Sequence, residues 1–464
     1  MRTRPRTALL AATAAVAGVL TAVPLDSAEA SRPAADVATT KLYELTVPAR
    51  TTVAKDAELL EAQGFDVLEG SGGGKVKVLA DPTERERLIS LGFSATVTRS
   101  LPQVRWKTPS TTDSTYYGGY PTVTGQYAHM DKVARTKPAL AKVVNYGASW
   151  RKKNDLGGSK LKAICITRIA GRKDCSLDPK APKPRFVLMG QMHAREIATG
   201  DVAYRWIDHL VGNYGTDATV TSLLNSTEFW VIPVANPDGV EIVQEGGDAP
   251  YLQRKNANTS NGQDCAIPPT GQSQSGVDLN RNAGFQWNTG GSSDDPCSPA
   301  YHGPTADSEP ELTAVQTLFR KLYPDTRGPA LTDIAAADTR GMFISLHSDT
   351  RMVLFPWAFT KDDAPNDASL RAIAAQLAAD TGFTHGQPGE LLYTASGGTD
   401  DWAYGELGIP SFTIEIGSTT DTTCNGFLPA YSCMESSYWP TMLPALLNAA
   451  KSARAPYQVS QSSR

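Results

Sequence analysis

The sequence predicts an α/β protein whose main part is a mixed, largely parallel sheet flanked by helices. Three observations indicate this fold. Hydrophobic residues make up 41% of the 464 residues and charged residues 20%, which suits a chain with a sizeable buried core. Apolar, β-branched runs alternate with helical patterns along most of the chain. A shorter α/β pattern precedes them, so we expect a small α/β sandwich ahead of the large sheet.

The runs that predict buried strands are mostly apolar and β-branched, as strands covered on both faces are. They are residues 161–169, 186–189, 229–234, 342–346 and 412–416. Two apolar helical faces lie between them, one formed by Ala203, Trp206, Ile207 and Leu210 and the other by Leu312, Val315, Phe319 and Leu322. Ser308 and Glu311 have the spacing of a capping box before the second face. Functional residues are expected at the strand ends, where open sheets bind ligands.

The small domain precedes a segment of different composition. Residues 41–49 and 75–80 alternate like strands, and 53–65 has a helical pattern. Asp81-Pro82-Thr83-Glu84 predicts a helix start, followed by a strand at 94–98. Residues 107–125 are rich in Thr, Ser, Gly, Pro and Tyr, which is typical of an exposed, cleavable connection. We therefore place a domain boundary after residue 112, with 113–464 as the main domain.

The first 30 residues have the pattern of a secretion signal. Arg2, Arg4 and Arg6 precede a mostly apolar stretch at 8–23, and Ala28-Glu29-Ala30 supplies small residues for cleavage. A membrane anchor is the alternative, although the stretch falls short of the about 20 apolar residues of a spanning helix. We expect a secreted, extracellular protein without membrane association.

Six cysteines fit a chain that reaches an oxidising compartment, and none forms a CxxC pair. Pairing between neighbours along the sequence would close three polar stretches, by joining Cys165 to Cys175, Cys265 to Cys297, and Cys424 to Cys433. Other pairings stay open, because connectivity cannot be deduced from sequence alone.

One short motif points to metal chemistry. His193-Ala194-Arg195-Glu196 follows the predicted strand 186–189, and its spacing places an imidazole and a carboxylate on one side of a turn or helix. A hydrolytic zinc site needs a third protein ligand, and His347 at the end of 342–346 suits it best. The alternatives are His129, His209, His302 and His385. HxxE alone is a weak signal, because such pairs are usually surface turns or capping contacts.

Further motifs follow in order, and together they resemble the secreted zinc carboxypeptidases of the pancreatic A and B type. They are Asn236-Pro-Asp-Gly239, Arg254-Lys255, Gly276-Val-Asp-Leu-Asn-Arg-Asn282, Tyr301-His-Gly303 with Ser308-Glu-Pro-Glu311, Ile344-Ser-Leu-His-Ser348, Tyr393-Thr-Ala-Ser-Gly-Gly-Thr-Asp400 and Phe412-Thr-Ile-Glu415. The resemblance covers roughly residues 115–450. It implies a sheet of the eight-stranded carboxypeptidase type and an activation propeptide at 31–112.

The resemblance also implies roles for individual residues. His193, Glu196 and His347 would bind one Zn²⁺, with Asp278 orienting His193, and Glu415 would be the general base. Arg254 would stabilise charge on the carbonyl oxygen. The remaining substrate-binding positions are Asn280, Arg281 and Tyr393 for the terminal carboxylate and Arg195 for the next subsite inward. Tyr393 has packing as its alternative, and His302 is expected to be structural.

Asp400 matches the pocket-floor position that distinguishes the B type, so a preference for C-terminal Lys or Arg is expected. Its neighbour Asp401 would occupy the pocket after a one-residue shift. Some apolar C-terminal residues are also expected to be accepted. Asp349 stands where the pancreatic enzymes have an aromatic residue, which leaves the inner subsites in doubt.

The resulting hypothesis is a secreted zinc metallocarboxypeptidase made as a zymogen, with peptide or protein C-termini as substrates and a protease as its activator. A monomer is expected, and the net charge of −4 without charge blocks argues against nucleic acid as a partner. Two alternatives are a cell-wall peptide hydrolase of the same fold and a catalytically silent peptide-binding module. The presence of Glu415, Arg254 and all three candidate ligands counts against the silent module.

Overall fold

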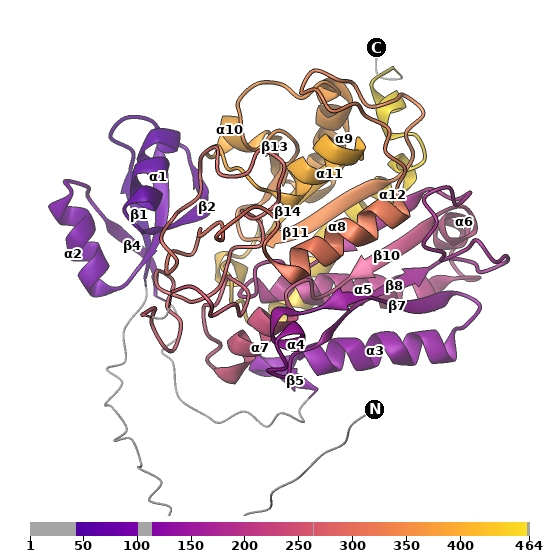
Figure 1. Ribbon diagram of the computed structural model, residues 1–464, viewed down its shortest axis with the longest axis horizontal. Helices are drawn as coiled ribbons and strands as arrows, with labels where there is room; N and C mark the ends of the chain where they lie inside the picture. The colour runs from indigo at the N-terminus through magenta and orange to yellow at the C-terminus, as the bar shows by residue number, and fades with distance from the viewer. Residues whose placement is uncertain (1–42, 101–113, 263, 462–464) are drawn as a thin grey trace, which may run out of the picture. The chain divides into compact units, whose positions relative to one another are not determined.

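The computed structural model describes residues 43–100, 114–262 and 264–461, and these fold around two main sheets (Figure 1). The first sheet has four strands and belongs to residues 43–100. The second has eight strands and is built from residues 141–416. Both sheets belong to one compact unit of the chain. The predicted signal at 1–30 lies outside the described residues, as do 107–113 of the predicted connection.

The small domain agrees with the predicted sandwich and adds one strand to it. Its elements are β1 (Tyr43–Pro48), α1 (Val53–Ala62), β2 (Asp66–Gly72), β3 (Lys75–Ala80), α2 (Pro82–Ser90) and β4 (Thr96–Ser100), with strand order β2-β3-β1-β4. All its strand pairs are antiparallel. The capping box of α2 is present, with Asp81 accepting from the Glu84 N–H and Glu84 accepting from the Asp81 N–H. Helix α1 ends earlier than predicted because 66–72 forms strand β2.

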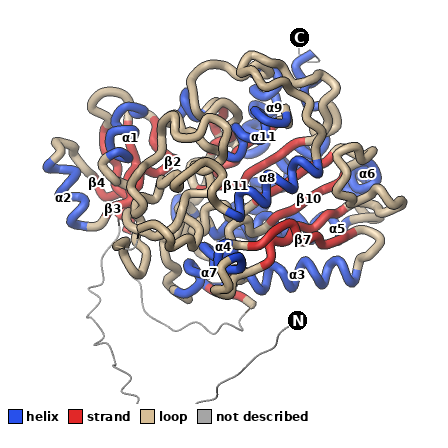
Figure 2. The backbone as a smooth tube through the Cα atoms, in the orientation of Figure 1, coloured by secondary structure: helices blue, strands red, loops and turns tan. Residues whose placement is uncertain are grey.

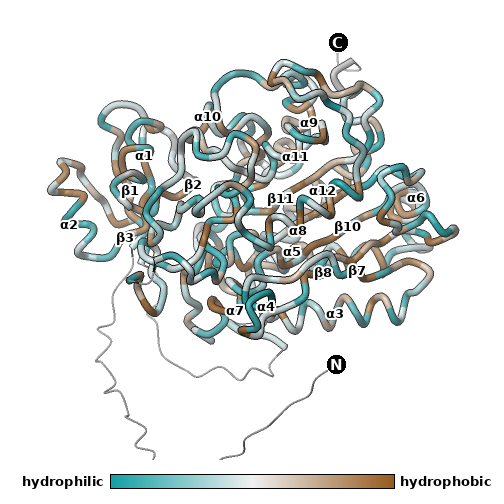
Figure 3. The backbone as a smooth tube through the Cα atoms, in the orientation of Figure 1, coloured by the Kyte–Doolittle hydropathy of each residue, from teal (hydrophilic) through white to brown (hydrophobic). Residues whose placement is uncertain are grey.

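The large sheet has the order β13-β12-β14-β11-β9-β10-β8-β7. Its central strands β14, β11, β9 and β10 are parallel, whereas β8, β7 and β12 run antiparallel to their inner neighbours. Every residue of β9, β10 and β11 is buried, and Figure 3 shows the hydrophobic colouring along β10 and β11. The strands are β7 (Ala141–Ala148), β8 (Lys160–Ile166), β9 (Arg185–Met189), β10 (Glu228–Ile232), β11 (Met342–Ser348), β12 (Met352–Leu354), β13 (Thr384–Gly386) and β14 (Ser411–Ile416).

Helices cover both faces of this sheet, with α8 in front and α12 behind in the view of Figure 1. Figure 2 shows the same arrangement, with long loops joining the helices to the strands. Both predicted helical faces are buried, in α5 and α8 respectively. The helices are α3 (Val123–Thr136), α4 (Trp150–Lys153), α5 (Ile197–Asn213), α6 (Ala218–Ser226), α7 (Pro237–Glu245), α8 (Pro310–Leu322), α9 (Asp367–Thr381), α10 (Pro388–Leu391), α11 (Thr399–Leu407) and α12 (Trp439–Ser452).

Two local predictions were wrong. Residues 114–125 are not an exposed connection, because Thr115–Tyr116 (β5) and Tyr120–Pro121 (β6) pair, Tyr120 is buried and α3 begins at Val123. Ser308 does not cap α8, because Pro310 starts the helix and makes Glu309 the cap residue. The Ser308 hydroxyl donates to the Glu309 carboxylate instead, and Glu311 accepts from the Trp150 N–H.

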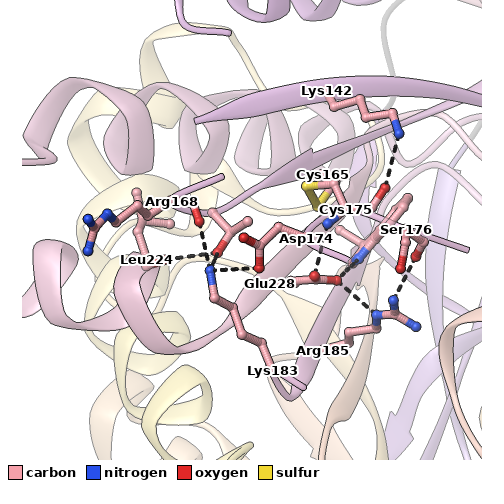
Figure 4. The surroundings of a disulfide bond; sticks show 12 residues. Lys142, Cys165, Arg168, Asp174, Cys175, Ser176, Lys183, Arg185, Leu224 and Glu228 are labelled. Carbon is pink, nitrogen blue, oxygen red and sulfur yellow. Dashed lines mark hydrogen bonds and ion pairs between the residues drawn. A yellow bond between two sulfur atoms is a disulfide. The ribbon is translucent and has the colours of Figure 1, made fainter. Parts of the chain in front are cut away.

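All three proposed disulfides are present: Cys165–Cys175, Cys265–Cys297 and Cys424–Cys433. Figure 4 shows the first, beside which Glu228 accepts from the Cys175 N–H at 2.9 Å and from Arg185 Nε at 2.8 Å. Among the described helices, none has the length and hydropathy needed to span a membrane.

Candidate active site

Two imidazoles and a carboxylate meet at the carboxyl edge of the central strands. His193 and Glu196 lie in the turn between β9 and α5, and His347 lies near the end of β11. His193 Nδ1 is 2.6 Å from Glu196 Oε1 and 3.0 Å from His347 Nδ1, which is itself 3.2 Å from Glu196 Oε2. Because β9 and β11 are parallel neighbours, their ends bring residues far apart in sequence to one place. The group has the composition and spacing to hold a metal ion.

The outer nitrogens of both imidazoles lie close to side-chain oxygen atoms. His193 Nε2 is 3.3 Å from Asp278 Oδ1, and His347 Nε2 is 3.0 Å from Ser345 Oγ. Each ring therefore turns its Nδ1 toward the group of three. Burial opposes ionisation of Asp278, yet Arg254 and His193 hold the pKa of that carboxyl well below its usual range. Burial likewise opposes ionisation of Glu196, but His193 and His347 lower its pKa to about 2. Both carboxylates are therefore ionised at neutral pH.

A guanidinium lies beside this group. Arg254 Nε donates to Asp278 Oδ2 at 2.9 Å, and Arg254 Nη1 is 4.0 Å from Glu196 Oε1. The side chain is buried, and the Gln274 carboxamide accepts from its backbone N–H. Arg254 is thus a fixed positive charge at the edge of the candidate metal site.

Glu415 connects the candidate metal site to a cavity. It lies on β14 in register with His347 on β11, so the two side chains stand on the same face of the sheet. The cavity is lined by Asn280, Arg281, Leu354, Ala358, Pro388, Leu392, Tyr393, Ala395, Gly398, Asp400, Thr413 and Glu415. Arg281 Nη2 donates to the Tyr393 hydroxyl at 3.3 Å. The structure therefore brings the predicted carboxylate-binding residues to the same cavity as the predicted base.

Asp400 and Asp401, in the first turn of α11, face different surroundings. Asp400 lines the cavity, where Oδ2 accepts from the Thr413 hydroxyl at 3.2 Å. Asp401 is turned away and accepts from the backbone N–H groups of Ala358 and Phe359. The one-residue shift considered from the sequence is thus not observed.

Arg195 lies next to the candidate ligands and contacts the small domain. Its guanidinium donates to both carboxylate oxygens of Asp66 in β2, at 2.5 and 3.0 Å. Arg195 is 1% exposed and Asp66 3% exposed, so the pair is shielded from water. The guanidinium carbon also lies 4.1 Å from the centre of the Phe427 ring.

A profile of the family described as zinc carboxypeptidase matches residues 126–441. The chain belongs to the zinc carboxypeptidase family. This membership confirms the family that the sequence predicts, the zinc metallocarboxypeptidases. It also confirms zinc as the family's metal, for which the His193, Glu196 and His347 group is present. The fold agrees with the predicted mixed sheet.

Two curated relatives illustrate the likeness. Mouse carboxypeptidase A2 is 31% identical over 320 residues, which cover 67% of this chain and 65% of the relative. Human carboxypeptidase B2 is 28% identical over 324 residues, 68% of this chain and 66% of the relative. The matched part thus spans slightly less than two thirds of these relatives.

Solved structures show the same fold. Carboxypeptidase A from Helicoverpa armigera has a TM-score of 0.69 at 23% identity and covers 92% of this chain and 99% of its own. Thrombin-activatable fibrinolysis inhibitor has a TM-score of 0.66 at 22% identity, covering 89% of this chain and 99% of its own.

Sequence reasoning gave no role to several residues that contact the predicted site, among them Asp66, Ser345, Thr413 and Phe427. Ser345 and Thr413 lie two positions before His347 and Glu415, so strand alternation could have found them. Asp66 and Phe427 come from segments with no motif of their own. His302 lies apart from the three ligand candidates, with Nδ1 2.7 Å from the Gly303 carbonyl and Nε2 2.9 Å from the exposed Asp294.

Proposed function

We propose that this chain is a secreted, zinc-dependent exopeptidase that removes the C-terminal residue of peptides and proteins, preferring Lys and Arg, and that it is made as a zymogen. One observation supports this function best. His193, Glu196 and His347 converge beside Glu415, which pairs in register with His347, and Glu415 lines a cavity that also holds Arg281 and Asp400. A buried guanidinium in this cavity suits a free terminal carboxylate, which an endopeptidase does not need to bind.

The donor set suits zinc. Two imidazole nitrogens and one carboxylate are the ligands of a hydrolytic zinc site, which keeps a further position for water or substrate. Asp278 lies next to His193 Nε2 and Ser345 lies next to His347 Nε2. The Nδ1 atoms of both rings therefore remain to bind a metal ion held together with Glu196. When bound there, zinc supplies a Lewis acid to the reaction.

The protein's own groups supply the proton transfer and the charge stabilisation. Glu415 takes a proton from the attacking water and delivers it to the nitrogen of the leaving residue, which lets the amine depart uncharged. Arg254, fixed by Asp278, places positive charge near the carbonyl oxygen, where negative charge grows in the transition state.

The cavity supports both the exopeptidase action and the side-chain preference. Arg281, Asn280 and Tyr393 would bind the terminal carboxylate, because a guanidinium fork pairs with it through two hydrogen bonds. Asp400 would pair with the cationic end of Lys or Arg. The walls contributed by Leu354, Ala358 and Pro388 are apolar, so Leu or Phe would be accepted more weakly.

The small domain would be the activation propeptide. Asp66 binds Arg195, which would line the next subsite inward, and Leu354, Leu392 and Tyr393 pack with the small domain's apolar cluster. A peptide could not reach Arg195 while Asp66 holds it. Cleavage by an activating protease between the two domains would release this contact. Secretion is supported by the three disulfides and by the N-terminal pattern.

The test is Glu415→Gln, which keeps the size of the side chain and removes its basicity. After limited proteolysis, release of Lys from a peptide should fall by about two to four orders of magnitude, while zinc content stays at one per chain. Unchanged turnover would remove Glu415 as the base. If the native protein releases no ordinary C-terminal residue but cleaves peptides containing diaminopimelate, the substrate class is wrong and the cell-wall alternative holds.

A further inference from the structure

The Cys424–Cys433 loop is contacted by segments that are far away in sequence. Its disulfide closes residues 425–432, and the Tyr438 hydroxyl donates to the Cys424 carbonyl at 2.6 Å, which ties the base of the loop to the segment that precedes α12. The loop thus has a fixed base, and contacts along its length can set its conformation.

The first folded residues of the main domain hold one side of this loop. The Tyr117 hydroxyl donates to the Leu428 carbonyl at 3.0 Å, and the Tyr120 hydroxyl donates to the Pro429 carbonyl at 3.1 Å. The Tyr120 ring also meets the Tyr431 ring edge to face, with centroids 5.0 Å apart. Two successive carbonyls of the loop are therefore fixed by the β5–β6 segment.

Phe427 immediately precedes Leu428 and Pro429 and links the loop to Arg195. Its ring lies 4.1 Å from the guanidinium carbon of Arg195, a cation–π contact in a buried setting. The neighbouring Asn425 carbonyl accepts from the Arg99 guanidinium at the end of β4. One loop therefore contacts Arg195, the β5–β6 segment and the small domain.

We propose that Tyr117 and Tyr120 are positioning residues for the substrate subsite that Arg195 lines, acting through the Cys424–Cys433 loop on Phe427 and Arg195. This inference rests on the proposed exopeptidase function, in which Arg195 binds the substrate upstream of the scissile bond. The tyrosine hydroxyls fix the loop carbonyls, the fixed loop holds the Phe427 ring, and the ring holds the Arg195 guanidinium in its binding orientation. The β5–β6 segment, at the N-terminus of the processed enzyme, therefore helps to fix the subsite that Arg195 lines.

The experiment compares two substrates of the proteolytically processed enzyme. One is an aromatic acyl-lysine, with a single acyl group before the scissile bond, and the other is a tetrapeptide ending in Lys. Tyr117→Phe/Tyr120→Phe should raise the KM of the tetrapeptide about five- to tenfold, as expected for two lost hydrogen bonds, with kcat unchanged. The acyl-lysine should keep its wild-type KM, because it does not reach Arg195.

The matched control is Tyr116→Phe, because the buried Tyr116 hydroxyl has no hydrogen-bond partner among the described residues. It should leave both substrates unchanged. A tetrapeptide KM that stays at the wild-type value in the double variant overturns the proposal. Equal rises for both substrates also overturn it, because they would show a general effect on the fold.

A second readout does not depend on activity. In the uncleaved chain, the double variant should speed hydrogen–deuterium exchange in peptides covering 425–433 and Arg195, and Tyr116→Phe should not. Faster exchange confined to 114–125 would overturn the coupling. A wild-type enzyme that hydrolyses neither substrate would instead refute the proposed function, while the exchange measurement still tests the connection.

Discussion

At the scale of single residues, the adjacent carboxylates Asp400 and Asp401 differ in the hydrogen-bond donors that surround them. Asp401 accepts from two backbone N–H groups, and burial together with the charge of Asp400 raises its pKa well above the usual range. Asp400 has one oxygen on the Thr413 hydroxyl and the other on the Asp401 N–H, and it borders the cavity. A carboxylate oxygen has lone pairs for more than one donor, so Asp400 can accept from a substrate cation as well.

Asp400→Asn tests this division. The substitution keeps the shape and removes the charge, so kcat/KM for peptides ending in Lys or Arg should fall about 30-fold or more, while Leu-ending peptides change by less than about threefold. Matched peptides differing only in the last residue provide the measurement. Asp401→Asn is the control: it should lower the unfolding temperature through the Ala358 and Phe359 contacts and keep the Lys preference. A Lys preference that follows Asp401 instead would contradict the assignment.

The sequence predicted residues best where a motif and a strand end coincide. His193, Glu196 and His347 could be found because each has a distinctive chemistry at the end of a continuous apolar run. Asp66 could not, since an Asp in a Gly- and Ser-containing stretch has no local signal for a partner 129 residues away. The ion pair of Arg195 depends on that partner, so it lies beyond what local sequence patterns contain.

At the scale of elements, the first turn of α4 depends on carboxylates from two other helices. The Trp150 N–H donates to Glu311 of α8 and the Arg151 N–H donates to Asp238 of α7, both at 2.6 Å. Helix N-termini leave such N–H groups without partners inside the helix. Two buried side chains therefore replace the missing acceptors and join α4 to α7 and α8.

This arrangement predicts a pH dependence of stability. Burial raises the pKa of Glu311 to about 7, against an unfolded value of about 4.5, although the Trp150 N–H opposes the shift. Between these values the folded state binds more protons than the unfolded state, so the free energy of unfolding falls as pH rises from about 4.5 to 7. Glu311→Gln cannot titrate and should show a smaller fall over this window in urea unfolding of the full chain. Parallel curves for the two proteins would show that Glu311 does not titrate in that range.

Central and edge strands differed in how well they could be predicted. The runs in β8, β9, β10, β11 and β14 were recognised because strands buried on both faces are continuously apolar. β7 was missed because it is an edge strand whose residues are mostly half-buried, and β12 and β13 have only three residues each. In the small domain, β2 was missed because its Gly and Ser residues resemble a turn. These strands are specified by their neighbours in the sheet and not by local periodicity.

At the scale of the whole molecule, the two domains share buried contacts of two kinds. The Asp66–Arg195 pair is ionic and bidentate, whereas Leu354, Leu392 and Tyr393 join the apolar cluster of the small domain. Apolar contacts favour association without selecting one orientation, and a bidentate pair requires one. The ion pair therefore places the small domain against Arg195, which the proposed zymogen needs in order to exclude long substrates.

Asp66→Asn tests whether the ion pair with Arg195, and not only the apolar contacts of the small domain, excludes substrate from the uncleaved chain. Removing one partner leaves the buried Arg195 charge without its counter-ion, which costs several kcal/mol at a buried site. The uncleaved variant should therefore hydrolyse a tetrapeptide ending in Lys at least about tenfold faster than the uncleaved wild type. After proteolysis the two proteins should have the same rate, since the small domain is then released. Glu58→Gln is the matched control, because within residues 43–100, 114–262 and 264–461 Glu58 accepts a single exposed hydrogen bond, from Thr394. The uncleaved Glu58→Gln protein should stay as slow as wild type. Equal activity of the uncleaved Asp66→Asn and wild-type proteins would mean that apolar coverage alone excludes substrate.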